Sequence, residues 1–260
     1  PSLASEYVTY VGQPILAVAA ITEEIAESAI DSIRIDFERR DFVVDPLESL
    51  TPGGRNAYPE GNVLVRTREE GPEGTPIVGA EIRDIKWPQS AIDALRSGQD
   101  PAEGEFTTEW AFGDIDAGFA ESVAVIEEPF VTMGYPHHSL EARTSMAYWE
   151  NGKCYLHASS QSHTFNVPDY AKYCGVETED LILIAEFCGG GFGSKGTAYP
   201  IATIPAHMSK KVGRPCMMRI TRAEEYFLGS RRNGFQGNVK LGFSEEGRLI
   251  AADLYVVQQG

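Results

Sequence analysis

The stretch of the chain best suited to chemistry is a glycine-rich loop that follows an apolar run. Residues 181–196 read LILIAEFCGGGFGSKG, with five glycines between residues 189 and 196. Glycine is required where φ is positive or where the backbone must approach a ligand with no Cβ in the way. We expect a strand before the loop and a helix after it, whose free N–H groups would suit an anionic ligand, with Lys195 as an added charge. The pattern predicts close contact with a phosphorylated or electron-rich ligand.

Three interpretations of this loop compete. A Walker-type phosphate loop needs glycine before its lysine and serine or threonine after it, whereas Lys195 is flanked by Ser194 and Gly196. A dinucleotide loop, G-x-G-x-x-G, is satisfied by Gly191, Gly193 and Gly196. The acidic residue that should follow such a loop about 20 positions later is missing, however. A tight structural turn without a ligand is the third interpretation, and the density of glycines disfavours it.

The elements that would position this loop form a series of strands and helices from residue 106 onward. Proline suits a helix start and glycine a helix end, so Pro168 and Gly175 bracket one helix and Gly213 ends another. By the pattern of apolar residues we expect strands at 123–133, 144–149, 153–159, 181–187, 216–221, 238–243 and 249–258, and helices at 167–174 and 197–211.

The N-terminal region is expected to open as strand, helix and strand. An apolar stretch at residues 7–20 predicts the first strand, although glycine and proline interrupt it. Thr22 is a suitable helix cap, since its side chain can accept a backbone N–H and glutamates follow in the first turn. Alternation of apolar and charged residues over 33–38 predicts a half-buried strand. The buried stripe of the helix is expected to consist of Ile25, Ala26, Ala29 and Ile30.

The middle of the chain contains the predicted domain boundary. Residues 45–85 are rich in proline, glycine and charge, and a short helix is expected over 90–96. The following stretch, SGQDPAEGEF at 97–106, has the composition of a linker or a long surface loop. We therefore place a boundary near residue 105.

Composition disfavours several classes of protein. The 260 residues have a formal net charge of −16, which opposes binding to nucleic acid. No apolar run approaches the roughly 20 residues that cross a bilayer, and the opening residues lack the pattern of a signal peptide. Sparse cysteines without a C-x-x-C pair argue against a zinc ribbon or an iron–sulfur cluster held by this chain alone. They also fit a cytoplasmic location, which we predict.

Several motifs resemble the xanthine dehydrogenase and aldehyde oxidase family of molybdenum hydroxylases, in the family's order. The family's G-G-G-F-G-G-K loop is similar to CGGGFGSKG, and its G-D-v-x-x-G-F-x-x-A segment is similar to GDIDAGFAES. Its S-T-Q segment and following helix resemble ASSQSHTFNVPDYAKYCGV, and its R-x-E and R-H-P-F segments resemble RITRAEEYFLGSRRNGFQGNVKLGF. The opening YVGQPILAVAA resembles the family's small hammerhead domain. The resemblance covers nearly the whole chain.

The resemblance implies an α+β fold and a cofactor. The fold would be an α/β hammerhead-like domain over 1–105, N-terminally incomplete, followed by the first part of a molybdopterin-binding α+β domain over 106–260, C-terminally incomplete. The cofactor would be molybdenum–molybdopterin, with the cytosine dinucleotide as one form of the pterin. Such enzymes resemble one another in hydroxylating an aldehyde or heteroaromatic carbon with oxygen from water. Their electrons leave through [2Fe–2S] clusters and FAD, which we expect on partner chains.

The resemblance also assigns residues. Gln161 matches the family glutamine whose amide lies against the oxo face of the molybdenum, where an amide can donate and accept without charge. In purine-hydroxylating relatives a substrate-binding glutamate follows the loop lysine. Here that position is Gly196, which together with Phe192 would line the pocket for a small-molecule substrate. The backbone stretch that would pass close to the cofactor comprises Gly190, Gly191, Phe192, Gly193 and Ser194.

Other interpretations of these residues stay open. Gln161 could be an ordinary surface-loop residue, and Phe192 could belong to the core. Lys195 could form a structural ion pair with an acidic neighbour, and Glu141, which matches a family glutamate, is interpreted as structural. The adjacent histidines at 137 and 138 would point to opposite faces of a strand, so no residue is assigned as a metal ligand.

The chain also departs from the family. The family's general base is a glutamate in a G-x-G-E-like segment, and neither this segment nor the glycine- and arginine-rich pocket loop is found here. We therefore expect a fragment or one subunit of a split enzyme, with the catalytic glutamate on a complementary polypeptide. The alternatives are a pterin-binding scaffold without turnover and a nicotinamide-binding domain.

Overall fold

The chain divides into two compact units, each assembled from two separate stretches. A computed structural model describes residues 3–4, 7–70, 76–99, 109–228 and 230–258. One unit comprises Pro1–Phe37 and Tyr135–Arg232, and the other comprises Glu38–Gly134 and Asn233–Gly260. The predicted domain boundary near residue 105 lies outside the described residues and stays a prediction.

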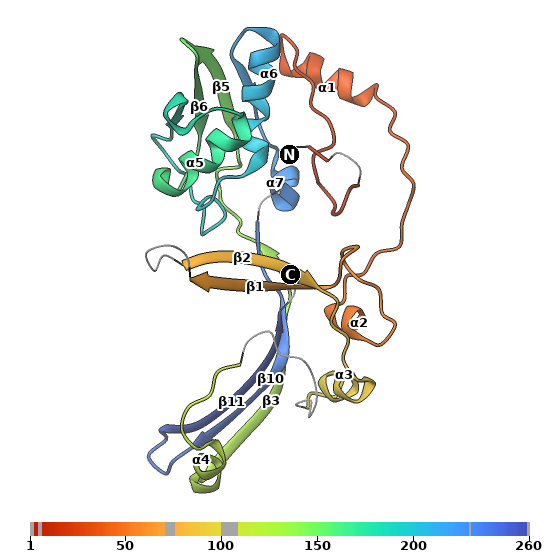
Figure 1. Ribbon diagram of the computed structural model, residues 1–260, viewed down its shortest axis with the longest axis vertical. Coiled ribbons are helices and arrows are strands. Elements are labelled where there is room, and N and C mark those ends of the chain that lie inside the picture. Colours follow the sequence, from red (N-terminus) through yellow and green to blue (C-terminus); the bar gives the residue numbers. More distant parts are fainter. Residues whose placement is uncertain (1–2, 5–6, 71–75, 100–108, 229, 259–260) are drawn as a thin grey trace. The chain divides into compact units, whose positions relative to one another are not determined.

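The first unit is built around a four-stranded sheet with strand order β7-β6-β5-β8. Strands β5 and β6 form an antiparallel hairpin, and their turn residues Asn151 and Gly152 both have positive φ, which these residue types tolerate. Strand β7 runs parallel to β6 because helix α5 supplies the crossover between them. Figure 1 shows α5 and α6 beside β5 and β6. The bounds are β5 Ser145–Glu150, β6 Lys153–Ala158, α5 His163–Cys174, β7 Leu181–Ile184, α6 Ile204–Val212 and β8 Cys216–Met218.

The core of this unit lies between the sheet and its helices. Every second residue of β6 is buried, as expected for a strand whose one face is covered. Leu156 of this strand is fully buried, and α6 packs against β5. The remaining buried members include Ala147, Cys154, Tyr170, Ala171, Cys174, Leu181, Ile201 and Ala206. The strands predicted over 144–149, 153–159, 181–187 and 216–221 are confirmed, although β7 and β8 end earlier.

Helix α5 begins earlier than the sequence predicts, and the second predicted helix begins later. Ser162 caps α5 by accepting a hydrogen bond from Phe165 N (3.4 Å), so Pro168 lies inside the helix. Gly175 ends it in the left-handed conformation, as predicted. The helix predicted over 197–211 is a 3₁₀ turn at Pro200–Thr203 followed by α6, which ends at Gly213.

The helix expected after the glycine loop is present, but it does not begin directly at the loop. Among the described residues the loop is followed by turns up to residue 197, because positive φ at Gly193 is incompatible with a right-handed helix. Loop N–H groups bond loop carbonyls instead: Ser194 N donates to Gly191 O (2.9 Å) and Gly196 N to Gly193 O (3.1 Å).

The N-terminal stretch of this unit differs most from the prediction. Thr22 caps α1 (Glu23–Asp31) as expected, accepting from Ile25 N (3.3 Å). The strands predicted over 7–20 and 33–38 are wrong, since neither stretch pairs with a strand in the described part of the chain. The predicted buried stripe is also wrong, since Ile25 and Ile30 of α1 are 49% and 47% exposed.

Three short elements complete the first unit. Strand β4 (Tyr135–Pro136) pairs antiparallel with β9 (Arg231–Arg232), and helix α7 spans Arg222–Leu228. None of the three was predicted. Helix α7 matters for the site described below, because it contributes a buried glutamate.

The second unit contains an antiparallel sheet with strand order β11-β10-β3 and a separate β1–β2 hairpin. The strands predicted over 123–133, 238–243 and 249–258 and the helix over 90–96 are confirmed, whereas the hairpin, α2 and α4 were not predicted. A small core comprises Leu47, Leu50, Ile85, Trp87, Ala91 and Ile92. The bounds are α2 Pro46–Leu50, β1 Val63–Glu70, β2 Pro76–Arg83, α3 Gln89–Arg96, α4 Ile115–Glu121, β3 Ala124–Thr132, β10 Phe235–Phe243 and β11 Leu249–Gln258. The mixed α+β class is confirmed.

Candidate functional site

The glycine loop after β7 adopts a backbone that only glycine allows at several points. Gly190 and Gly193 have φ of 96° and 105°, which side-chain-bearing residues rarely adopt. Gly191 is needed for space instead, because an added Cβ would lie 2.1 Å from Gln161 Oε1. Phe192 also has positive φ (54°), and its side chain is 61% exposed. The interpretation of Phe192 as a core residue is therefore wrong.

Gln161 holds the loop by its side-chain oxygen. Oε1 accepts hydrogen bonds from Gly193 N (3.0 Å) and Lys195 N (3.1 Å), and Gln161 N donates to Lys195 O (2.9 Å). Both groups that face the amide are donors, so the atom between them must be oxygen and Nε2 must point away. Within the described residues Nε2 meets no protein acceptor, and Gln161 is exposed. It is thus a surface-loop residue with a specific role in shaping the loop.

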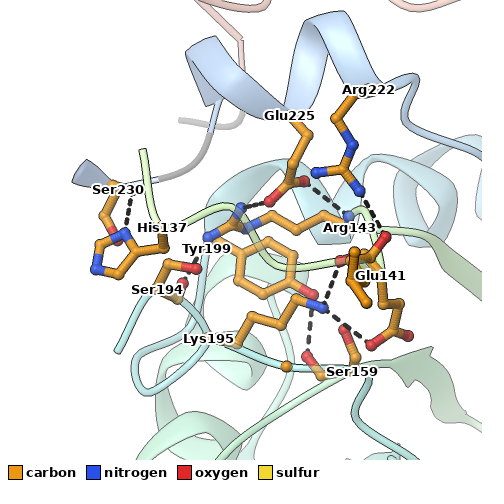
Figure 2. Close-up of polar contacts among 12 residues, drawn as sticks. His137, Glu141, Arg143, Ser159, Ser194, Lys195, Tyr199, Arg222, Glu225 and Ser230 are labelled. Carbon is orange, nitrogen blue, oxygen red and sulfur yellow. Dashed lines mark hydrogen bonds and ion pairs between the residues drawn. The ribbon is translucent and has the colours of Figure 1, made fainter. Parts of the chain in front are cut away.

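Lys195 points into the protein rather than toward a ligand. Its ammonium is fully buried and donates to Glu141 O (2.9 Å) and Glu141 Oε2 (3.0 Å), as Figure 2 shows. Glu141 Oε2 also accepts from Gly189 N (2.5 Å). The structural ion pair considered from the sequence is confirmed, and the idea that Lys195 adds charge to a ligand site is wrong.

A second buried ion pair was not predicted. Arg143 lies between β4 and β5 and pairs with Glu225 of α7, while its Nη2 donates to Ser194 O (2.6 Å). The guanidinium also lies over the ring of Tyr199, 4.8 Å from its centroid. Burial raises the pKa of Tyr199, so its hydroxyl stays protonated and donates to Ser159 O (3.0 Å). The sequence offered a hint for Glu225, which lies in the segment similar to the family's R-x-E segment, but charged residues are usually expected on the surface.

Two basic residues, one in β9 and one just after β4, lie beside the glycine loop. Arg232 Nη2 donates to Phe192 O (2.7 Å), and His137 Nδ1 lies 2.6 Å from Ser230 O. The Arg232 contact was missed from the sequence, although the R-H-P-F-like motif contains this residue. Gly196 is half-buried, and Ser194 is buried with its Oγ unpartnered among the described residues.

The residues predicted for the cofactor and the substrate thus come together. Gly190–Gly196 form one continuous loop, and Gln161 bonds two of its N–H groups. In the described ranges, no group of three or more His, Cys, Asp or Glu side chains could hold a metal ion. Within the same ranges, no helix combines the length and apolar composition that a membrane span needs.

Comparison with known proteins decides the family. A family model described as the molybdopterin cofactor-binding domain matches residues 99–260, which is more than half of the chain. The chain belongs to the molybdopterin cofactor-binding domain family. The matched range contains both the glycine loop and Gln161. The resemblance to xanthine dehydrogenases and aldehyde oxidases, which was drawn from the motifs, is confirmed.

Similar proteins place this molybdopterin domain in larger polypeptides. A probable xanthine dehydrogenase subunit of Bacillus subtilis (strain 168) is 26% identical over 99% of this chain and 29% of the relative. The aldehyde oxidoreductase molybdenum-binding subunit PaoC of Escherichia coli (strain K12) is 26% identical over 73% of this chain and 26% of the relative. The solved aldehyde oxidoreductase from Desulfovibrio desulfuricans ATCC 27774 matches with a TM-score of 0.67 at 18% identity, over 99% of this chain and 24% of that chain. The last likeness shows the fold, and the chain spans less than a third of each relative.

Proposed function

We propose that this chain forms one side of a molybdenum–molybdopterin site in a hydroxylase that oxidises an aldehyde or heteroaromatic substrate. The geometry of Gln161 carries the proposal. Two loop N–H groups occupy its Oε1, so Nε2 is left as a donor at an exposed position. An amide N–H can donate to a metal-bound oxygen without bringing charge to the site. Family membership and the exposed ring of Phe192 support the same assignment.

The loop fits a pterin-bound metal in its shape and charge. At Gly193 an added Cβ would find its nearest neighbour, His137 Nε2, only at 3.6 Å, so the backbone there is open to close approach. Lys195 and Arg143 are buried and paired with carboxylates, so these two cations are turned away from the exposed face. When bound, the cofactor supplies the two-electron oxidation of the substrate carbon with oxygen from water.

Each residue of the loop has a separate role in this proposal. Nε2 of Gln161 would face the metal as an uncharged hydrogen-bond donor, and the backbone of Gly190–Ser194 would lie against the cofactor. The ring of Phe192 forms one wall of the substrate pocket, and Gly196 leaves space where a glutamate side chain would otherwise bind a purine. The pterin would be the cytosine dinucleotide form.

The rest of the enzyme is proposed to lie on other polypeptide segments. A complementary segment supplies the catalytic glutamate, and iron–sulfur and FAD subunits receive the electrons, in the cytoplasm. Two relatives are themselves named as subunits, which supports an assembly. A nicotinamide-binding domain is disfavoured, because no helix begins directly at the glycine loop to present its N–H groups to a pyrophosphate; the next helical turn starts only at Pro200.

The molybdenum content of the assembled enzyme tests this function. We expect stoichiometric molybdenum in the wild type and loss of most of it in G191V, because the new side chain would collide with Gln161 Oε1. The control for a general effect of replacing a glycine is G247A, at an exposed turn glycine with positive φ (74°) where an added Cβ has no neighbour within 4 Å. Absence of molybdenum from the wild type under good cofactor supply would contradict the proposal. Metal without turnover would favour the scaffold alternative.

A further inference from the structure

The buried ion pair of Arg143 and Glu225 contacts the glycine loop at Ser194 (Figure 2). Arg143 is 2% exposed and Glu225 is 5% exposed, and Glu225 Oε2 also accepts from Arg143 N (2.8 Å). Taking two charges out of water is costly, and replacing a buried ion pair by apolar residues is often neutral or stabilising. Stability alone therefore does not explain why these two charges are placed here.

The ion pair is connected to the glycine loop by hydrogen bonds through one peptide group. Arg143 Nη2 donates to Ser194 O, and the N–H of that same peptide, on Lys195, donates to Gln161 Oε1. A cation at a carbonyl oxygen polarises the peptide and makes its N–H a stronger donor, since hydrogen bonds in series reinforce one another. The contacts therefore form a continuous series from Glu225 through Arg143 and this peptide to the Gln161 amide.

We propose that Arg143, held by Glu225, is a positioning residue that fixes the orientation of the Gln161 amide through the Ser194–Lys195 peptide. Without the guanidinium the Ser194 carbonyl loses this partner, the Lys195 N–H becomes a weaker donor, and Gln161 Oε1 is left with its bond from Gly193 N as the firmer of the two. A single firm bond lets the amide turn, so that Nε2 no longer faces outward. This inference rests on the proposed function for its catalytic consequence, but the positioning itself is a property of this chain.

Amide hydrogen exchange tests the positioning in the assembled enzyme. In R143M/E225M both charges are removed together and the volume is largely kept, and we expect exchange at Lys195 N–H to be about tenfold faster. The matched control is R222M. Arg222 lies on α7, as Glu225 does, and donates to the backbone carbonyl of Leu140 (2.5 Å). Among the described residues it has no hydrogen bond to the Ser194–Lys195 peptide. Unchanged exchange at Lys195 in R143M/E225M, or an equal change in R222M, would overturn the inference.

A double-mutant cycle tests whether the pair acts through Gln161. We expect R143M/E225M to lower kcat about tenfold when Gln161 is present and less than about twofold in a Q161A background, because residues acting through one group are not additive. Equal losses in both backgrounds would indicate a general structural role and overturn the inference. A wild-type enzyme without molybdenum would refute the proposed function, while the exchange experiment would still decide the positioning.

A milder variant covers the case in which R143M/E225M does not assemble. In R143K the positive charge remains opposite Glu225, but a single ammonium cannot reproduce the planar fork that serves both the carboxylate and Ser194 O. Faster exchange at Lys195 N–H in assembled R143K supports the inference. Exchange equal to that of the wild type contradicts it.

Discussion

Gln161 combines two functions in one side chain, because its oxygen shapes the loop while its nitrogen is left to donate. The glycine pattern itself predicted a ligand-binding loop, and the resemblance to the family predicted the role of this glutamine. The sequence did not predict the buried ion pair of Arg143 and Glu225, because a local pattern does not indicate that two charged residues distant in sequence will be buried together. The loop lysine shows the same limit, since only the fold reveals that Lys195 faces Glu141.

The two functions of Gln161 can be separated by substitution. In Q161E a carboxylate oxygen can still accept from Gly193 N and Lys195 N, but the Nε2 donor is lost. We expect Q161E to keep its molybdenum and to lose at least about tenfold in kcat, as expected when one hydrogen bond to a developing charge is removed. Q161A should lose activity to a similar extent and, because each lost bond contributes about 1 kcal/mol, should also be slightly less stable. Full turnover in Q161E would show that the donor is not used.

Gly196 leads to a prediction about substrate class. It supplies no side-chain acceptor, and a polar group of the substrate that is buried without a partner costs binding free energy. We expect aromatic aldehydes and quinoline-like rings to have higher kcat/KM values than hypoxanthine and xanthine on the assembled enzyme. Purines as the best substrates would refute this role of Gly196.

At the scale of elements, the strands were predicted well where they pack against a neighbour within the chain. Strand β6 alternates buried and half-buried residues, and the apolar run before the loop is strand β7. The stretches at 7–20 and 33–38 have strand-like patterns but no partner strand among the described residues, and pairing is what makes a strand. The β1–β2 hairpin was missed because its sequence is rich in charge, which hides the strand pattern.

The end of α5 offers a test of how much the helix that follows Gln161 depends on its caps. Gly175 has φ of 70° and open space around an added Cβ, so G175A introduces backbone strain without a clash. We expect a loss of about 1 kcal/mol in the free energy of unfolding, measured in denaturant, with unchanged kcat per folded molecule. G175N should recover part of that loss, because asparagine tolerates the left-handed conformation. Equal stability of G175A and the wild type would mean that this end of the helix is frayed.

At the scale of the whole molecule, the chain matches only part of each relative, and it is proposed to form one side of the cofactor site. The family's glutamate segment is not found in these 260 residues, and in the proposed function a complementary segment supplies this general base. We therefore expect the purified 260-residue chain to show no hydroxylase turnover and the addition of the complementary polypeptide to restore it. Robust turnover by the chain alone, measured with an aldehyde and an artificial electron acceptor, would contradict this division.

The central claim is that the outward face of Gln161 and the glycine loop meets a molybdenum centre. The most direct measurement is an experimental structure of the assembled, cofactor-loaded enzyme. We predict a molybdenum-bound oxygen at roughly 3 Å from Gln161 Nε2, the distance of an N–H···O hydrogen bond, with Oε1 still bonded to Gly193 N and Lys195 N. A molybdenum centre bound away from this loop, or Nε2 turned inward with Oε1 facing the metal, would contradict the account.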